Sequence, residues 1–151
     1  MGSYREHLRV PVSWWLLAIP VIAILGGELY AGFGGFIPPL IYAVFIAVVG
    51  GFLLIWGSTS VEVADGTLRA GKDTLQLSQV GDVVALDEKQ AALLRGPRAD
   101  PAAHLMLRPY IKRAVYIALA DPAGGVPYWL VATRHPAELA TAIERERQTV
   151  G

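Results

Sequence analysis

The chain has 151 residues, of which 54% are hydrophobic and only 17% are charged, whereas soluble domains usually carry charge on about a quarter of their residues. Basic and acidic residues balance, so no net field attracts nucleic acid, and the lack of cysteine excludes a disulfide scaffold and a thiol catalyst. Residues 1–60 contain four charged side chains and residues 61–151 contain twenty-two. The sequence therefore predicts a membrane anchor followed by a small water-exposed domain of about 90 residues.

Two uncharged segments, of eighteen and thirty-three residues, lie in the first part of the chain. About 20 apolar residues span the hydrocarbon core, and glycines followed by Pro38-Pro39 interrupt the second segment. We therefore expect membrane helices at about 12–30 and 39–56, joined by a turn at 31–38. A cleaved signal peptide is the alternative for the first helix, but the segment is long and no small-x-small cleavage site follows it.

The transmembrane hairpin is expected to occupy residues 1–59 and the soluble domain residues 60–151. Four basic residues flank the predicted helices: Arg5, Arg9, Arg69 and Lys72. The turn between the helices has none. Because basic residues near the ends of membrane helices favour the cytoplasm, we expect a multi-pass protein of the plasma membrane with both termini cytoplasmic.

Glu28 is the one charged residue between the ends of the hairpin. It lies about 24 Å along a helix that begins at residue 12, near the outer headgroups. Two roles stay open: an interfacial or helix-packing carboxylate, or a contact for an ion, a proton or a partner. In the second role Glu28 would serve a small transport or channel accessory component, in an oligomeric helix bundle. Gly26-Gly27 and Gly50-Gly51 either allow close helix approach or are tolerated without that role.

Hydrophobic and polar residues alternate after the second helix, which is typical of β-strands. Segments 61–63 and 68–70 flank Asp65-Gly66, a pair that favours a type I′ hairpin turn. A second turn at 71–73 leads to a strand at 75–77. Further elements are expected in this order: a strand at 80–86, a short helix at 87–94, a loop at 96–104, a strand at 113–120, a turn at 121–125 and a strand at 127–133.

The last segment, 136–148, is predicted to be a helix with an apolar pair at Leu139 and Ile143. The order predicts an α+β membrane protein, in which a two-helix hairpin precedes a small antiparallel β domain, PH-like, with a C-terminal helix. Eight residues should form its core: Val61, Val63, Leu68, Leu75, Leu77, Val83, Leu139 and Ile143. Of the neighbours Tyr128 and Trp129, one should be buried and the other exposed, because adjacent strand residues point to opposite faces.

One basic cluster follows the predicted short helix. It comprises Arg95, Arg98, Arg108, Lys112 and Arg113, with Tyr110 among them, and the acidic residue within it is Asp100. Anionic lipid near the membrane would attract such cations, at about 1 kcal/mol each. A protein-binding loop and an ordinary solvated face are the alternatives. Arg95, Arg98 and Lys112 are expected to be exposed.

No constellation of residues points to catalysis. No nucleophile lies beside a base, and the nearest approach to a metal pair is His135 with Glu138, which lacks a third ligand. A helix-capping role explains that pair better. We therefore expect no enzyme, no metal and no cofactor.

Three segments together resemble a known family: residues 4–11 (YREHLRVP), residues 113–115 (RAV) and residues 127–136 (PYWLVATRHP). They resemble DUF3093, an actinobacterial family of unknown function, in order over nearly the whole chain. The family usually has Ser in place of Ala132 and a basic residue in place of His135. The resemblance implies a small integral membrane protein with two spans and a cytoplasmic β-rich domain, and it brings no activity or functional residues.

These features favour a non-enzymatic membrane protein whose cytoplasmic domain is an interaction module. Its first expected partner is the lipid bilayer. The cytoplasmic domain is expected to bind either anionic lipid headgroups or another membrane protein. Homo-oligomerisation stays open, and no nucleic acid is expected.

Overall fold

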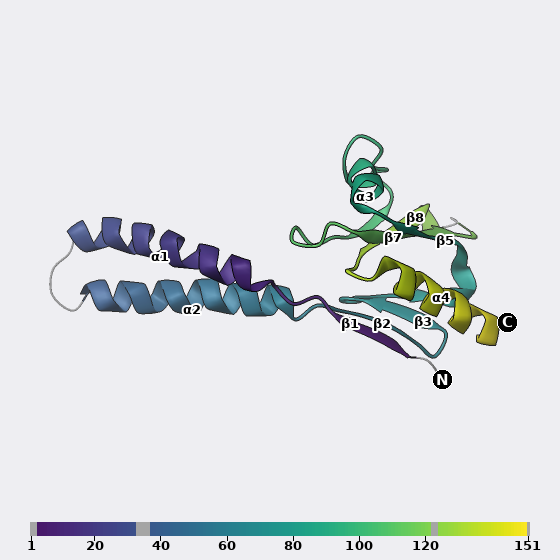
Figure 1. Ribbon diagram of the computed structural model, residues 1–151, viewed down its shortest axis with the longest axis horizontal. Coiled ribbons are helices and arrows are strands. Elements are labelled where there is room, and N and C mark those ends of the chain that lie inside the picture. The colour runs from purple at the N-terminus through teal and green to yellow at the C-terminus, as the bar shows by residue number, and fades with distance from the viewer. Residues whose placement is uncertain (1–2, 33–36, 122–123, 151) are drawn as a thin grey trace. The chain divides into compact units, whose positions relative to one another are not determined.

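The computed structural model describes residues 3–32, 37–121 and 124–150, as drawn in Figure 1. Contacts divide the chain into two compact units, Arg9–Thr59 and a second unit made of Met1–Leu8 with Ser60–Gly151. The α+β class is confirmed: the chain forms two long apolar helices, two sheets and a C-terminal helix. The expected boundary differs at the N-terminus, because the first eight residues group with the β domain and not with the hairpin.

The hairpin unit contains α1 (Val12–Gly32) and α2 (Ile37–Gly57), close to the predicted bounds. Within the described residues, these two helices are long and apolar enough to cross a membrane. Residues 33–36, in the middle of the expected turn, lie outside the described residues. The helices therefore fit the predicted spans in length and composition.

Gly26 decides how α1 packs against α2. The less exposed residues of α1 recur at every fourth position, at Trp14, Ala18, Ile22 and Gly26. A Cβ atom at Gly26 would lie 2.2 Å from Cε1 of Tyr42 on α2, so any larger residue there must displace that ring. At Gly51 an added Cβ meets nothing within 4 Å. Close helix approach thus explains Gly26 but not Gly51.

The first sheet of the β domain is antiparallel, in the order β1 (Tyr4–His7), β2 (Ser60–Ala64), β3 (Thr67–Ala70) and β4 (Asp73–Gln76). The turn between β2 and β3 has φ values of 51° at Asp65 and 68° at Gly66, the left-handed region that a type I′ turn needs. That predicted hairpin is confirmed. Strand β1 was not predicted: it pairs with β2 from Tyr4 opposite Val63 to His7 opposite Ser60.

The second sheet has the order β5 (Val80–Leu86), β7 (Ala114–Leu119), β8 (Tyr128–Ala132) and β6 (His104–Met106). Strand β6 begins at the end of the predicted loop and runs parallel to β8, so this sheet is mixed, whereas the other strand pairs of the domain are antiparallel as expected. The short 3₁₀ helix η1 (Leu77–Gln79) precedes β5. Helix α3 (Glu88–Arg95) starts with a capping box between Asp87 and Gln90.

The main core lies between the two sheets and α4 (Pro136–Val150), the yellow helix in Figure 1. Seven of the eight predicted core residues are buried there, and Val83 is only partly buried. The prediction for Tyr128 and Trp129 is wrong, since they are only 7% and 8% exposed. They do point to opposite faces, but α3 and the segment after it cover the second face, where Tyr128 packs with Leu86 and Ala91.

Candidate functional site

The chain leaves the β domain for the hairpin at two neighbouring places. Strand β1 ends at His7 and β2 begins at Ser60, and these two residues are paired. We call this end of the domain the junction end. The turn between β3 and β4 lies there too, because the amide of Gly71 donates to the carbonyl of Ser60 at 2.9 Å.

The segment before β7 also reaches the junction end. The Tyr110 hydroxyl donates a hydrogen bond of 2.8 Å to the carbonyl oxygen of Leu8. Burial raises the pKa of Tyr110, while the nearby Arg108 and Arg134 act in the opposite direction. The hydroxyl therefore keeps its proton, and its hydrogen bond, at neutral pH.

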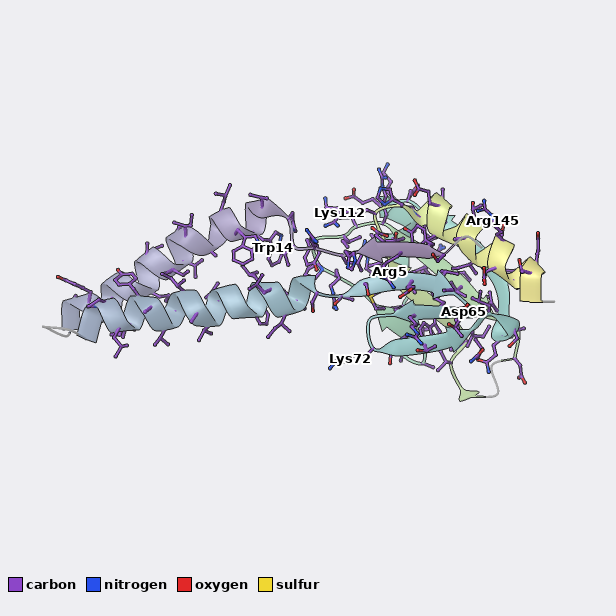
Figure 2. The ribbon with its side chains drawn as sticks, turned by 90° about the horizontal axis from the view of Figure 1, so that it is seen from below. Arg5, Trp14, Asp65, Lys72, Lys112 and Arg145 are labelled. Atoms are coloured by element: carbon purple, nitrogen blue, oxygen red, sulfur yellow. The ribbon has the colours of Figure 1, made fainter. Side chains whose placement is uncertain are left out.

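Basic side chains from three segments gather at this end. Lys72 lies in the β3–β4 turn, Lys112 and Arg113 precede β7, and Nη1 of Arg134 lies 3.5 Å from the His7 carbonyl oxygen. Figure 2 shows Lys72 and Lys112 at one end of the β domain and Asp65 and Arg145 at the opposite end. Four of the basic side chains thus lie where the chain departs for the hairpin.

The basic cluster predicted from the sequence contains both partly buried and exposed residues. Arg95 is partly buried and donates to the carbonyl oxygens of Ala91, Ile111 and Lys112, so it fastens α3 to the segment before β7. The expectation that Arg95 is exposed is therefore wrong, because the end of α3 needs a donor for its carbonyl groups. Arg98 and Lys112 are exposed as expected.

A shallow hollow of about 250 Å³, the basic pocket, lies beside the Tyr110 ring. Three cations line it, Lys112, Arg113 and Arg134, and its acidic member is Glu88. Glu88 pairs with Lys112 at 2.9 Å, and both side chains are more than half exposed. The lining therefore has a net positive charge and suits an anionic ligand.

Glu6 is a buried carboxylate that sequence reasoning missed, with 8% exposure. Its oxygens accept the backbone N–H of Arg134 at 2.9 Å, the Tyr4 hydroxyl at 2.9 Å and the Thr133 hydroxyl. The ring of His135 lies 3.6 Å away, so this histidine faces Glu6. Glu6 thereby fixes β1 to the corner that carries Arg134.

The model of a family described as protein of unknown function, DUF3093, matches residues 3–143. The chain belongs to this family. No curated protein and no solved structure matches it. The DUF3093 match includes β1, both long helices and the β domain as far as Ile143 in α4. The strand before the hairpin and the sheet after it are therefore parts of one family pattern.

Glu28 of this DUF3093 protein lies on the exposed side of α1. It follows Gly26 by two residues, which places it about 200° around the helix from the face that meets Tyr42. Glu28 therefore points away from α2. Among the described residues of the DUF3093 chain, no three His, Asp or Glu side chains form a group that would hold a metal ion.

Proposed function

We propose that this DUF3093 protein spans the plasma membrane twice, with both termini cytoplasmic, and that its PH-like β domain is a non-enzymatic module that binds anionic lipid headgroups. The observation that carries the proposal is the gathering of Lys72, Lys112, Arg113 and Arg134 at the junction end. The succession of strands closed by the C-terminal helix α4 supports the PH-like description.

The pairing of β1 with β2 supports the proposed topology. These strands flank the hairpin in sequence and are neighbours in one sheet, so they must lie on the same side of a membrane. A hairpin of two spans satisfies that condition, whereas a single span does not. The basic residues at the junction end then favour the cytoplasmic side.

The linkers between the junction end and the two helices are short. Residues 8–11 join β1 to α1, and Ser58 and Thr59 join α2 to β2. A two-residue linker reaches at most about 11 Å. A tether this short supports the proposal that cations at this end act on an anionic leaflet, where attraction decays over a Debye length of about 8 Å at physiological salt.

Lipid retention by the full-length protein in detergent tests the proposal. Native mass spectrometry would compare retained phosphatidylglycerol with phosphatidylcholine of the same chains. We expect preferential retention of the anionic lipid, which Lys72→Glu and Arg113→Glu each reduce about fivefold or more, as about 1 kcal/mol for each cation implies.

Arg145→Glu is the matched control, because Arg145 is exposed at the opposite end of the domain, and it should leave retention unchanged. Equal retention of both lipids by the wild-type protein would overturn the lipid function and favour a protein ligand at the junction end. Equal losses for Arg145→Glu and Lys72→Glu would remove the junction end as the binding surface.

A further inference from the structure

We propose that the basic pocket binds one phosphate group, presented by a lipid phosphomonoester. This inference rests on the proposed function and assigns it a specific site. The pocket collects cations from two segments, with Lys112 and Arg113 before β7 and Arg134 after β8. The β7–β8 pairing brings these segments together, because the amide of Thr133 donates to the carbonyl of Arg113 at 3.2 Å.

The charges in the pocket suit a doubly charged oxyanion. Arginine offers a planar fork of donors that matches two phosphate oxygens, and the pocket has two such groups, in Arg113 and Arg134. Glu88 opposes them, but its pair with Lys112 is exposed and therefore weak. A phosphate dianion can replace Glu88 as the partner of Lys112, and the whole pocket is then electrostatically complementary to it.

The backbone of Arg134 is fixed before any ligand arrives. Its amide N–H is held by the buried carboxylate of Glu6 at 2.9 Å, and the preceding residue, Thr133, is fully buried and bonded to the same carboxylate. The Tyr110 ring beside it is held through the Leu8 carbonyl. A fixed backbone lowers the entropy lost when the Arg134 side chain orders around an anion, which favours binding at this place over binding to cations on mobile segments.

The pocket belongs to the end of the β domain from which the chain leaves for the hairpin. Tyr110 contacts Leu8 and Arg134 approaches His7, and the chain reaches the first residue of α1 four residues after Leu8. The hollow of about 250 Å³ is open and shallow, so it admits a headgroup and not an acyl chain. A lipid with a terminal phosphate therefore fits better than a buried apolar ligand.

Binding to full-length protein in detergent tests the site, with three probes: dioctanoyl phosphatidic acid, dioctanoyl phosphatidylcholine and inorganic phosphate. Isothermal titration calorimetry should show phosphatidic acid binding, with phosphatidylcholine at least tenfold weaker. Arg113→Gln should weaken phosphatidic acid binding about tenfold, as loss of a charge-assisted pair implies. Arg134→Gln should act similarly, and Arg113→Gln keeps the test decisive if Arg134→Gln lowers the melting temperature.

Lys72→Gln is the control that separates this inference from the proposed function. Lys72 lies at the junction end but does not line the basic pocket, so this variant should retain phosphatidic acid binding while losing part of the general preference for anionic lipid. Equal losses for Lys72→Gln and Arg113→Gln would overturn the pocket and leave the lipid function standing. Inorganic phosphate binding as tightly as phosphatidic acid would overturn the lipid source and assign the site to free phosphate.

Discussion

The buried side chain of Glu6 holds several segments together at the junction end. It accepts hydrogen bonds from Arg134, Tyr4 and Thr133, so it joins the N-terminal strand to the start of α4. Burial raises the pKa of Tyr4, which keeps that hydroxyl a donor at neutral pH. The carboxylate therefore meets donors on several sides and positions the corner that supplies Arg134 to the basic pocket.

Removal of this carboxylate should destabilise the β domain. Glu6→Ala leaves three donors without their acceptor, and we expect the free energy of unfolding to fall by about 3 kcal/mol. Thermal and chemical unfolding of the full-length protein in detergent measure this. The matched control is Glu62→Ala on β2, whose partner Arg5 is 60% exposed, so its loss should cost less than about 1 kcal/mol. Equal losses of unfolding free energy in the two variants would contradict the stabilising role of Glu6.

In the hairpin, Gly26 is the residue whose replacement should most disturb the packing of the two helices. Gly26→Ala places a methyl group 2.2 Å from the Tyr42 ring, and the shift that follows should destabilise the helix pair by about 1–3 kcal/mol. Gly51→Ala adds the same methyl group in open space and should have little effect. Thermal stability in detergent compares them. In a double-mutant cycle, Tyr42→Ala should rescue Gly26→Ala, and failure of that rescue would contradict the predicted clash.

At the scale of elements, the sequence predicts features that depend on neighbouring residues and misses those that depend on distant ones. Asp65-Gly66 predicts its turn because both residues tolerate the positive φ angles that the turn needs, and the capping residue Asp87 predicts the start of α3. Strand β1 gives no such signal, because Arg5, Glu6 and His7 interrupt any apolar alternation and its partner β2 lies beyond the hairpin. Strand β6 has three residues and pairs in parallel with a distant strand.

The site was predictable to the same degree. Lys112 and Arg113 stand out as neighbouring charges in the sequence, and they do line the basic pocket. Arg134 is not part of the basic cluster predicted from the sequence, since only the β7–β8 pairing brings it beside Lys112 and Arg113. The sequence does not distinguish Arg95 from the exposed basic residues of the cluster, because the carbonyl group of Ile111 that it binds comes close only in the folded domain.

Strand β1 should be required for a stable β domain. A chain of residues 60–151 alone lacks β1, including Glu6, and the fully buried Leu8 that follows it. We expect trypsin to degrade it rapidly. A chain in which residues 3–8 are joined to Ser60 by a short turn should be resistant. Equal resistance of the two chains would show that β1 is dispensable.

Helix α4 should be equally necessary. Leu139 is fully buried in the main core, and Leu139→Ala should cost about 2–5 kcal/mol and make the β domain protease-sensitive. Leu93→Ala on α3 is the control, because Leu93 is 44% exposed. Unchanged protease resistance in Leu139→Ala would mean that α4 does not close the core.

At the scale of the whole molecule, the proposed topology has a direct test in a chain without cysteine. Gly32→Cys replaces an exposed residue with open space around it, and Gln148→Cys lies on the exposed side of α4. An impermeant thiol reagent should label the first in intact cells and the second only after permeabilisation. The reverse labelling would invert the proposed orientation.

The insertion of the hairpin between paired strands has a consequence for biosynthesis. Strand β1 leaves the ribosome first, but its partner β2 begins only after both long helices have been made. With one helix inserted in place of two, the strands would be held on opposite faces of the bilayer and the first sheet could not close. If the hairpin crosses the bilayer as proposed, the first sheet closes only when the two helices insert together, and a chain with a single helix inserted is left with an open sheet edge for proteases to recognise.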